Sequence, residues 1–308
     1  MQKNDLLKFF DRGLGNMGKF NSAGHFRNFL DLIKLRITLM QSVTFAMGFW
    51  LGNIGQFDLN TFIYGLIGTG LVASGAGAIN HAMEKDIDKL MNRTKNRPLP
   101  TGFYSIKTVV GISFLFLIFG SSILIFKVNL LTAVLAILTY IFYVIYTVSK
   151  KHTSLNTLIG AIPGAMAPLG GWTASSGTLN LDSWAFFIIL FVWQLPHFYA
   201  IAWMFKDDYE KANLKMISCF DTDGSRTYRQ ILITIILLIG VSVYPYFTGM
   251  LGSVYLFGSI GLGCFFLVNG LKFRNDRTVS RARKIMRVSI IYLPLLLLVM
   301  IIDIQWMI

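Results

Sequence analysis

The composition of this 308-residue chain excludes an ordinary soluble domain. Hydrophobic residues make up 54% of it and charged residues 14%, and the mean hydropathy is +0.59, whereas soluble domains are roughly a quarter charged. The net charge of +13 does not indicate a nucleic-acid partner, because the cations gather in a few segments between long apolar stretches. Cys219 and Cys264 are too few and too far apart in sequence to predict a disulfide or a metal site.

The apolar residues form stretches long enough to cross a bilayer, which takes about 20 residues each. They predict an all-α, polytopic membrane protein, a bundle of nine transmembrane helices. No linker divides the chain, so we expect one transmembrane domain over residues 1–308, in which residues 1–30 form a cytoplasmic N-terminal segment. In chain order, the predicted spans are 35–52, 61–83, 106–126, 130–148, 155–174, 184–205, 230–248, 252–271 and 288–307.

The basic residues predict how this bundle lies in the membrane. With nine spans, every Lys and Arg except Lys127 falls on one side, in the N-terminal segment and in alternate loops. Positive charge marks the cytoplasmic side, so we expect a cytoplasmic N-terminus and an external C-terminus, with the cations attracting anionic membrane lipids. The N-terminal segment lacks the Arg- and Ser-rich, acid-poor composition of a transit peptide, which favours the bacterial plasma membrane.

Three polar side chains follow at four-residue spacing where the second span meets a basic loop. A helix turns about 100° per residue, so Asn80, Glu84 and Asp88 share one face and Asp86 lies near the opposite side. Carboxylate and amide oxygens suit Mg²⁺, which usually keeps sites for waters and substrate phosphates. A solvated helix end is the alternative interpretation of the same residues.

A run of cations, which includes Arg93, Lys95 and Arg97, follows immediately after these acids. Metal-binding acids beside Arg and Lys fit a diphosphate, because the metal neutralises part of its charge and the cations donate hydrogen bonds to the remaining oxygens. A plain basic cytoplasmic loop would explain the cations, but it would not explain the spacing of the three polar residues before them.

Residues 80–101, NHAMEKDIDKLMNRTKNRPLPT, resemble the acid-rich first motif of the UbiA-type intramembrane prenyltransferases, and within that superfamily the branch of the haem O synthases (protoheme IX farnesyltransferases). Further family signatures agree in order along the chain. They are Leu35-Arg36, similar to a Lys-Pro-Arg sequence before the first span, and residues 146–156 (YTVSKKHTSLN), 160–172 (GAIPGAMAPLGGW) and 193–216 (WQLPHFYAIAWMFKDDYEKANLKM).

Four positions depart from the family pattern. Leu35 and Ala167 stand where the family has proline, and Asn213 and Lys215 stand where it more often has Gly and Pro. These departures affect loop geometry, particularly in the loop that follows the sixth span, and they remove no expected ligand.

The resemblance implies an enzyme that transfers the farnesyl group of farnesyl diphosphate to a vinyl group of haem B and makes haem O, with Mg²⁺ as cofactor. Haem A synthase and haem-copper oxidase assembly proteins are partners implied by the resemblance alone. The expected catalytic residues and Mg²⁺ ligands are Asn80, Glu84, Asp88 and Asp208. The expected substrate-binding residues are Arg36, Arg93, Arg97, Tyr146, Lys150, Lys151 and His197.

His197 lies within the sixth predicted span, 184–205. On a continuous helix, His197 and Asp208 lie on nearly the same face about 16 Å apart along the axis. Pro196 would kink the helix there and shape a cavity. We therefore expect His197 to face the haem, as an iron ligand or as a donor to the porphyrin. A packed, hydrogen-bonded histidine is the alternative.

Two other functions compete with this one. The first is transfer of a prenyl chain to a quinone precursor or another aromatic acceptor, which the Pro196-His197-Phe198 and Asp207-Asp208-Tyr209 sequences disfavour. The second is a non-enzymatic transporter. Transporters are expected to place ionisable residues near the bilayer midplane, whereas nearly every charge in this chain falls at the predicted cytoplasmic rim.

Overall fold

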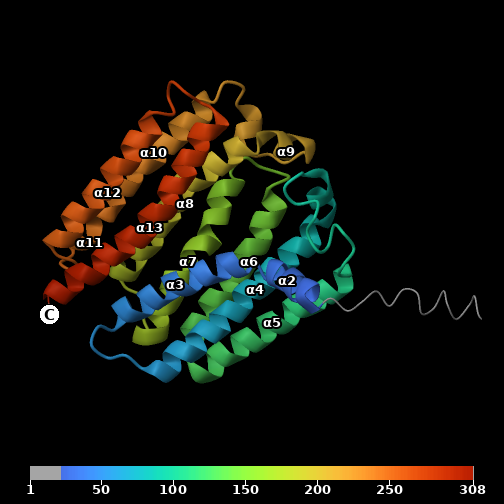
Figure 1. Ribbon diagram of the computed structural model, residues 1–308. Helices are drawn as coiled ribbons and strands as arrows, with labels where there is room; N and C mark the ends of the chain where they lie inside the picture. The colour runs from blue at the N-terminus through green and yellow to red at the C-terminus, as the bar shows by residue number, and fades with distance from the viewer. Residues whose placement is uncertain (1–21, 308) are drawn as a thin grey trace, which may run out of the picture.

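The computed structural model describes residues 22–307, and helices make up most of them (Figure 1). No strand occurs in this described range. Residues 1–21, the larger part of the predicted N-terminal segment, lie outside it. The helices are α2 (Ser22–Leu32), α3 (Leu35–Gly52), α4 (Leu59–Leu90), α5 (Ile106–Lys127), α6 (Leu130–Ser149), α7 (Asn156–Ser176), α8 (Leu181–Met204), α9 (Lys206–Lys211), a 3₁₀ helix (Ile217–Phe220), α10 (Ser225–Ser242), α11 (Tyr244–Phe247), α12 (Ser253–Leu271) and α13 (Val279–Met307).

Within the described residues, seven helical segments are long and apolar enough to cross a membrane. They are α4, α5, α6, α8, α10 together with α11, α12 and α13. The prediction of an all-helical, multi-pass membrane protein is therefore confirmed. Helices α3 and α7 occupy the other two predicted ranges, and α7 carries Pro163 and Pro168 within its length. Length and composition do not identify these two as spans, so the count of nine and the orientation of the termini stay predictions.

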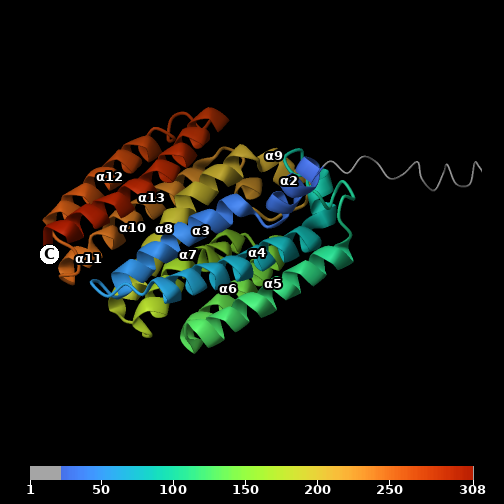
Figure 2. The same cartoon turned by 60° about the horizontal axis from the view of Figure 1, so that its bottom comes forward.

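Helix α4 carries the polar motif, and it runs beyond the predicted end of its span at residue 83 to Leu90. Its first turn is capped by Asp58, whose carboxylate accepts hydrogen bonds from the backbone N–H groups of Asn60 and Thr61. Continuous helix past residue 83 keeps the four-residue spacing on one face. Helix α4 packs along α5 and also contacts α3, α6 and α7 (Figure 2). The face that carries Asn80, Glu84 and Asp88 is buried in the bundle.

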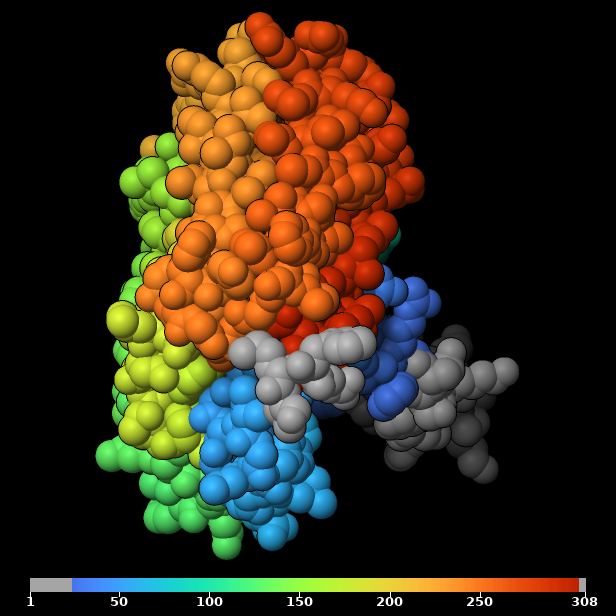
Figure 3. Space-filling view, turned by 90° about the vertical axis from the view of Figure 1, so that its left-hand side faces the viewer, coloured from blue at the N-terminus to red at the C-terminus, as the bar shows by residue number. Residues whose placement is uncertain are grey.

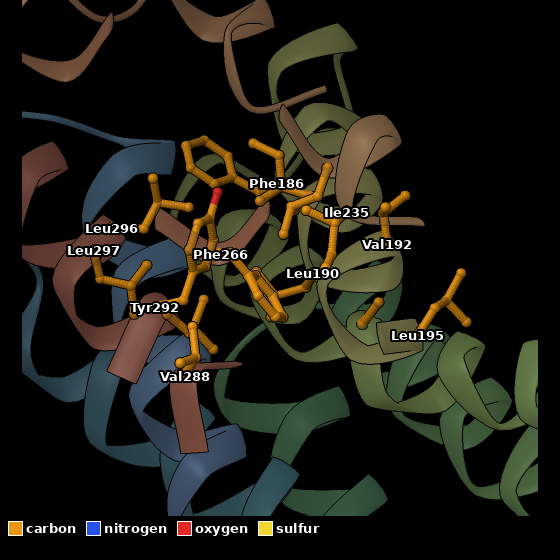
Figure 4. Close-up of a cluster of buried hydrophobic side chains, with 14 of the residues drawn as sticks. Phe186, Leu190, Val192, Leu195, Ile235, Phe266, Val288, Tyr292, Leu296 and Leu297 are labelled. Atoms are coloured by element: carbon orange, nitrogen blue, oxygen red, sulfur yellow. The ribbon is translucent and has the colours of Figure 1, made fainter. Parts of the chain in front are cut away.

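The bundle has two halves that are packed differently. In the half formed by α8, α10, α12 and α13, large side chains interdigitate in one apolar core (Figure 4). Phe186, Ile235, Phe266 and Tyr292, one from each helix, lie together there. In the space-filling view α10, α12 and α13, orange and red, fill the upper part of the molecule, and blue residues of the N-terminal half lie below them (Figure 3).

Glycine allows very close helix contact in the N-terminal half. A Cβ atom on Gly171 of α7 would lie 1.9 Å from the carbonyl oxygen of Phe45 on α3, and one on Gly48 would lie 2.1 Å from the carbonyl oxygen of Pro168. Small residues that let backbones approach are typical of helix pairs in membranes. The α3–α7 contact therefore depends on the absence of these two side chains.

This close approach predicts a large cost for Gly171→Leu. The added side chain must push α3 away from α7, and overpacking of this kind costs about 1–3 kcal/mol or more. Thermal unfolding of the purified protein in detergent should show a clearly lower midpoint. Gly261→Leu on α12 is the matched control, because a Cβ atom at Gly261 meets no other atom within 4 Å. Equal midpoints for the two variants would contradict this account of the α3–α7 contact.

Candidate functional site

The polar face of α4 is buried, as its spacing predicts. Asn80 and Asp88 are fully buried and Glu84 is 5% exposed. Asp86 points the other way, with a side chain that is 89% exposed and paired with Lys89 on the surface. The alternative of a solvated helix end therefore does not apply to Asn80, Glu84 and Asp88, whose polar groups must be matched by partners inside the protein.

Each buried carboxylate is matched by a cation from a different segment. Lys150, directly after α6, donates to Glu84 Oε1 at 2.6 Å. Arg97, in the loop after α4, contacts both oxygens of Asp88 at 2.9 and 3.0 Å. Burial favours the neutral form of the Lys150 amine, but the Glu84 carboxylate outweighs it and raises the pKa of Lys150 above its usual value. The Lys150–Glu84 pair is therefore charged.

Asn80 is matched by Lys34, a residue that sequence reasoning did not select. Lys34 Nζ donates to Asn80 Oδ1 at 2.5 Å and to the Tyr143 hydroxyl at 3.1 Å, and Asn80 Nδ2 donates to Thr147 Oγ1 at 2.9 Å. Lys34 lies between α2 and α3 with a left-handed φ of 50°, a conformation that is uncommon outside glycine. Burial lowers the pKa of Lys34 to about 7.

Arg36, which was expected to bind substrate, is exposed and lies outside the cavity described below. Helix α3 begins at Leu35, so the two cations of Lys34-Leu35-Arg36 point in different directions once the chain turns at Lys34. The signal that could have identified Lys34 is its place in that tripeptide. The turn that aims it inward is not visible in the residue pattern.

Asp208 supports Arg93 instead of joining the two carboxylates. Its Oδ2 atom accepts the backbone N–H of Arg93 at 3.2 Å. The Arg93 guanidinium lies 4.6 Å from the centre of the Phe205 ring and donates to the Tyr209 hydroxyl at 3.3 Å. The expectation of one continuous helix from His197 to Asp208 is wrong. Helix α8 ends at Met204 and α9 begins at Lys206, with the break at Phe205.

His197 is a residue of α8, and its side chain contacts α13. Its Nδ1 atom is 2.7 Å from Ser289 Oγ, and its ring stacks on Trp193 with centroids 6.0 Å apart. The residues of α8 that reach the cavity are Gln194, Phe198 and Ile201. The structure therefore places His197 as a packed, hydrogen-bonded residue in this state, and the expected contact with a haem stays an untested prediction.

The buried charges open onto one cavity of about 370 Å³, which is within the usual size of a small-molecule site. Four cationic and two anionic side chains reach it, so the cavity carries an excess of positive charge. They are Lys34, Arg93, Arg97, Lys150, Glu84 and Asp88. Tyr143, Tyr146 and Phe198 contribute aromatic surface next to them.

Gly160 makes room for one of these rings. A Cβ atom at Gly160 would lie 2.6 Å from the Tyr146 ring. Glycine at position 160 therefore lets the ring of Tyr146 pack closely against α7. The Lys150 ammonium lies 4.4 Å from the centre of the same ring. This arrangement gives Lys150 a cation–π contact in addition to its ion pair with Glu84.

The expected site residues thus divide into two groups. Glu84, Asp88, Arg93, Arg97, Tyr146 and Lys150 line the cavity. Asn80, Asp208, Arg36, Lys151 and His197 do not. Lys151 is exposed and lines a separate hollow with Asp86. Asn80 and Asp208 contact residues that do reach the cavity, so they can position Lys34 and Arg93.

The cavity offers a metal ion two carboxylates as ligands, which is fewer than a metal site made of protein side chains alone requires. Among residues 22–307, no cluster of three or more His, Cys, Asp or Glu side chains converges at metal-binding distance. Glu84 and Asp88 nevertheless line the same cavity. Mg²⁺ is usually bound through one or two carboxylates together with substrate phosphates. The donor set therefore fits Mg²⁺ that binds together with a phosphate-bearing ligand.

Comparison with known proteins identifies the family. A model of the UbiA prenyltransferase family matches residues 42–293. A protoheme IX farnesyltransferase of Solibacter usitatus is 40% identical over 287 residues, which are 90% of this chain and 98% of that protein. One of Salinibacter ruber is 37% identical over 277 residues, with the same coverage of both proteins.

Solved structures share the fold. A digeranylgeranylglyceryl phosphate synthase has a TM-score of 0.76 at 17% identity, covering 90% of this chain and 98% of that one. A UbiA homologue from Archaeoglobus fulgidus, bound to GPP and Mg²⁺, has a TM-score of 0.69 at 15% identity, covering 89% and 99%. The match to the family model and the identity to the two relatives show that the chain belongs to the UbiA prenyltransferase family.

Proposed function

We propose that the chain transfers the farnesyl group of farnesyl diphosphate to a vinyl group of haem B and so makes haem O. The observation that carries this proposal is the single cavity in which two buried carboxylates and four cations lie beside aromatic side chains. The identity of the acceptor is supported by the names of relatives that are 37–40% identical over 90% of the chain.

The diphosphate would bind at the charged end of the cavity. Lys34, Arg93, Arg97 and Lys150 supply more positive charge than Glu84 and Asp88 balance, and an anion removes that imbalance. Arg offers several donors in a planar fork and Lys a compact charge, and both suit phosphate oxygens. Asn80 holds Lys34, and Asp208 holds the backbone of Arg93, so both cations are positioned before substrate arrives.

Glu84 and Asp88 would hold Mg²⁺ together with the diphosphate oxygens. When bound, the metal supplies positive charge that stabilises the leaving diphosphate. The family relative from Archaeoglobus fulgidus was solved with GPP and Mg²⁺, which supports this cofactor. On this proposal Asn80 and Asp208 act as positioning residues, in place of the metal-ligand roles that the sequence resemblance implies.

The residues of the cavity then promote ionisation of farnesyl diphosphate. The allylic C–O bond of farnesyl diphosphate breaks and its electron pair leaves with the diphosphate, where the cations stabilise the developing charge. The vinyl π electrons of haem B form the new C–C bond. Water adds to the resulting porphyrin-side cation and releases one proton. Tyr143, Tyr146 and Phe198 offer aromatic faces to the first cation and keep water from it.

The same proposal includes the arrangement in the membrane. Nine helices, α3 to α8, α10, α12 and α13, would cross the bilayer, with the N-terminus in the cytoplasm and the C-terminus outside. The cavity would then open near the cytoplasmic face of a bacterial plasma membrane. Haem A synthase or haem-copper oxidase assembly proteins would receive the product.

Substitution of the two cavity carboxylates should abolish transfer. Glu84→Gln and Asp88→Asn should each lower farnesyl transfer to haem B by at least about a hundredfold, the scale on which a lost electrostatic contact to a reacting group is felt. The reason is that a neutral amide cannot hold Mg²⁺ and diphosphate comparably. The measurement is haem O formed per minute by purified enzyme in nanodiscs.

Asp86→Asn is the matched control, because Asp86 lies on the same helix with its side chain 89% exposed. It should leave the rate close to that of the unaltered protein. Equal losses for Asp86→Asn and Asp88→Asn would contradict the assignment of the buried face as the reactive one.

Lys34 should contribute to diphosphate binding and Arg36 should not. Lys34→Met keeps the aliphatic stem but removes the charge, so inorganic diphosphate should bind about tenfold or more weakly. Arg36→Met should change the affinity little. Calorimetric titration of inorganic diphosphate with Mg²⁺ measures both. A larger effect for Arg36→Met would restore the original expectation from the sequence.

The same titration has a pH dependence. Burial lowers the pKa of Lys34 to about 7. The Lys34 amine therefore loses its proton, and with it the positive charge that attracts an anion, as the pH rises from about 6 to about 8. Diphosphate affinity should therefore fall over this range by more in the unaltered protein than in Lys34→Met. The variant corrects for titration of diphosphate itself. Identical pH profiles would contradict a role for Lys34.

A further inference from the structure

A neutral amide lies in the wall of the cavity, away from the buried charges. Gln194 of α8 is 5% exposed and lines the cavity beside Gly164 of α7. Along α7, Gly164 lies one turn, about 6 Å, beyond Gly160. Gly160 packs against the Tyr146 ring, which the Lys150 ammonium contacts on its other side of the cavity wall. Gln194 therefore lies deeper in the bundle than the charged end of the cavity.

The hydrogen bonds of Gln194 determine which end of its amide faces the cavity. Gln194 Nε2 donates to the carbonyl of Leu190 at 2.9 Å and to the carbonyl of Ala161 at 3.4 Å. Both partners are acceptors, so the atom that contacts them must be the NH₂ group. The Oε1 atom lies over Gly164, where a Cβ atom would come within 1.9 Å of it. Gln194 thus offers the cavity a hydrogen-bond acceptor in a fixed position.

An acceptor at this place selects one reactant of the proposed reaction. Farnesyl diphosphate offers acceptor oxygens and a hydrocarbon chain. Haem B has its ring nitrogens bound to iron, and its ionised propionates are acceptors as well. Water is the reactant that has hydrogen-bond donors. A water molecule that donates to Gln194 Oε1 keeps its lone pairs free for attack on a cation.

We propose that Gln194 Oε1 holds the water molecule that adds to the porphyrin side chain, so that Gln194 is a catalytic residue of the last step. The inference rests on the proposed function and adds a residue to it. Farnesyl transfer to the terminal vinyl carbon leaves a cation on the vinyl carbon next to the porphyrin. A lone pair of the held water forms the C–O bond, and the proton that water loses passes to the released diphosphate. Without this water, the cation loses a proton from the neighbouring CH₂ group and forms a C=C bond, which gives a product that lacks one water.

The test is the ratio of dehydrated product to haem O formed by Gln194→Met, whose side chain has a similar length and no carbonyl. Purified enzyme in nanodiscs is given farnesyl diphosphate, Mg²⁺ and haem B, and the haems are separated and identified by mass spectrometry. Loss of one hydrogen bond to the water should raise the ratio about tenfold. Both products come from the same cation, so the ratio does not depend on how much of the variant is folded.

Gly164→Ala is a second test that leaves Gln194 in the chain, because the added methyl group must displace Gln194 Oε1. It should raise the same ratio. Gln230→Met on α10 is the matched control, since it makes the same chemical change at a residue that does not line the cavity, and its ratio should equal that of the unaltered protein. An unchanged ratio in either cavity variant would overturn the role of Gln194, although the proposed function would stand. If the unaltered protein forms no farnesylated haem, both the role of Gln194 and the proposed function are overturned.

Discussion

The structure depends on the need to balance charge that is buried at one end of an apolar bundle. Glu84 and Asp88 are enclosed on α4, and each is paired with a cation from another segment, Lys150 and Arg97. Buried ion pairs contribute little net stability, because desolvation offsets their attraction, yet removing one partner costs several kcal/mol, about 3–5. These pairs are therefore better understood as a site held together in advance of its ligand. The additional cations Lys34 and Arg93 leave the cavity with an excess of positive charge.

The helices serve this site in two ways. The C-terminal half packs large apolar side chains into one core and contributes α8, which closes one wall of the cavity. The N-terminal half relies on glycine contacts between α3 and α7 and leaves narrow space between its helices. Tight contact and free space thus occur in the same part of the bundle.

Sequence alone predicted the parts of this arrangement that depend on local repetition. The apolar stretches placed the long helices to within a few residues, with two exceptions. Helix α4 continues seven residues beyond the predicted end of its span, and α13 begins nine residues before the predicted start of its span. The four-residue spacing put Asn80, Glu84 and Asp88 on a buried face with Asp86 opposite.

The sequence alone could not predict features that depend on a turn of the backbone or on contact between distant segments. Lys34 enters the cavity because of one left-handed residue, and the break at Phe205 turns Asp208 toward Arg93. Likewise, α13 supplies Ser289, which holds His197 away from the cavity wall.

The central claim is that one cavity joins a farnesyl group to haem B, and the mass of the haem formed in membranes tests it most directly. Haems would be extracted from bacterial membranes that lack any other enzyme of this kind, with and without this chain, and analysed by mass spectrometry. The account predicts a new haem, heavier than haem B by one farnesyl group and one hydroxyl, that appears only when the chain is present. Unchanged haem B together with a newly prenylated quinone precursor would contradict the account and assign the cavity to a different acceptor.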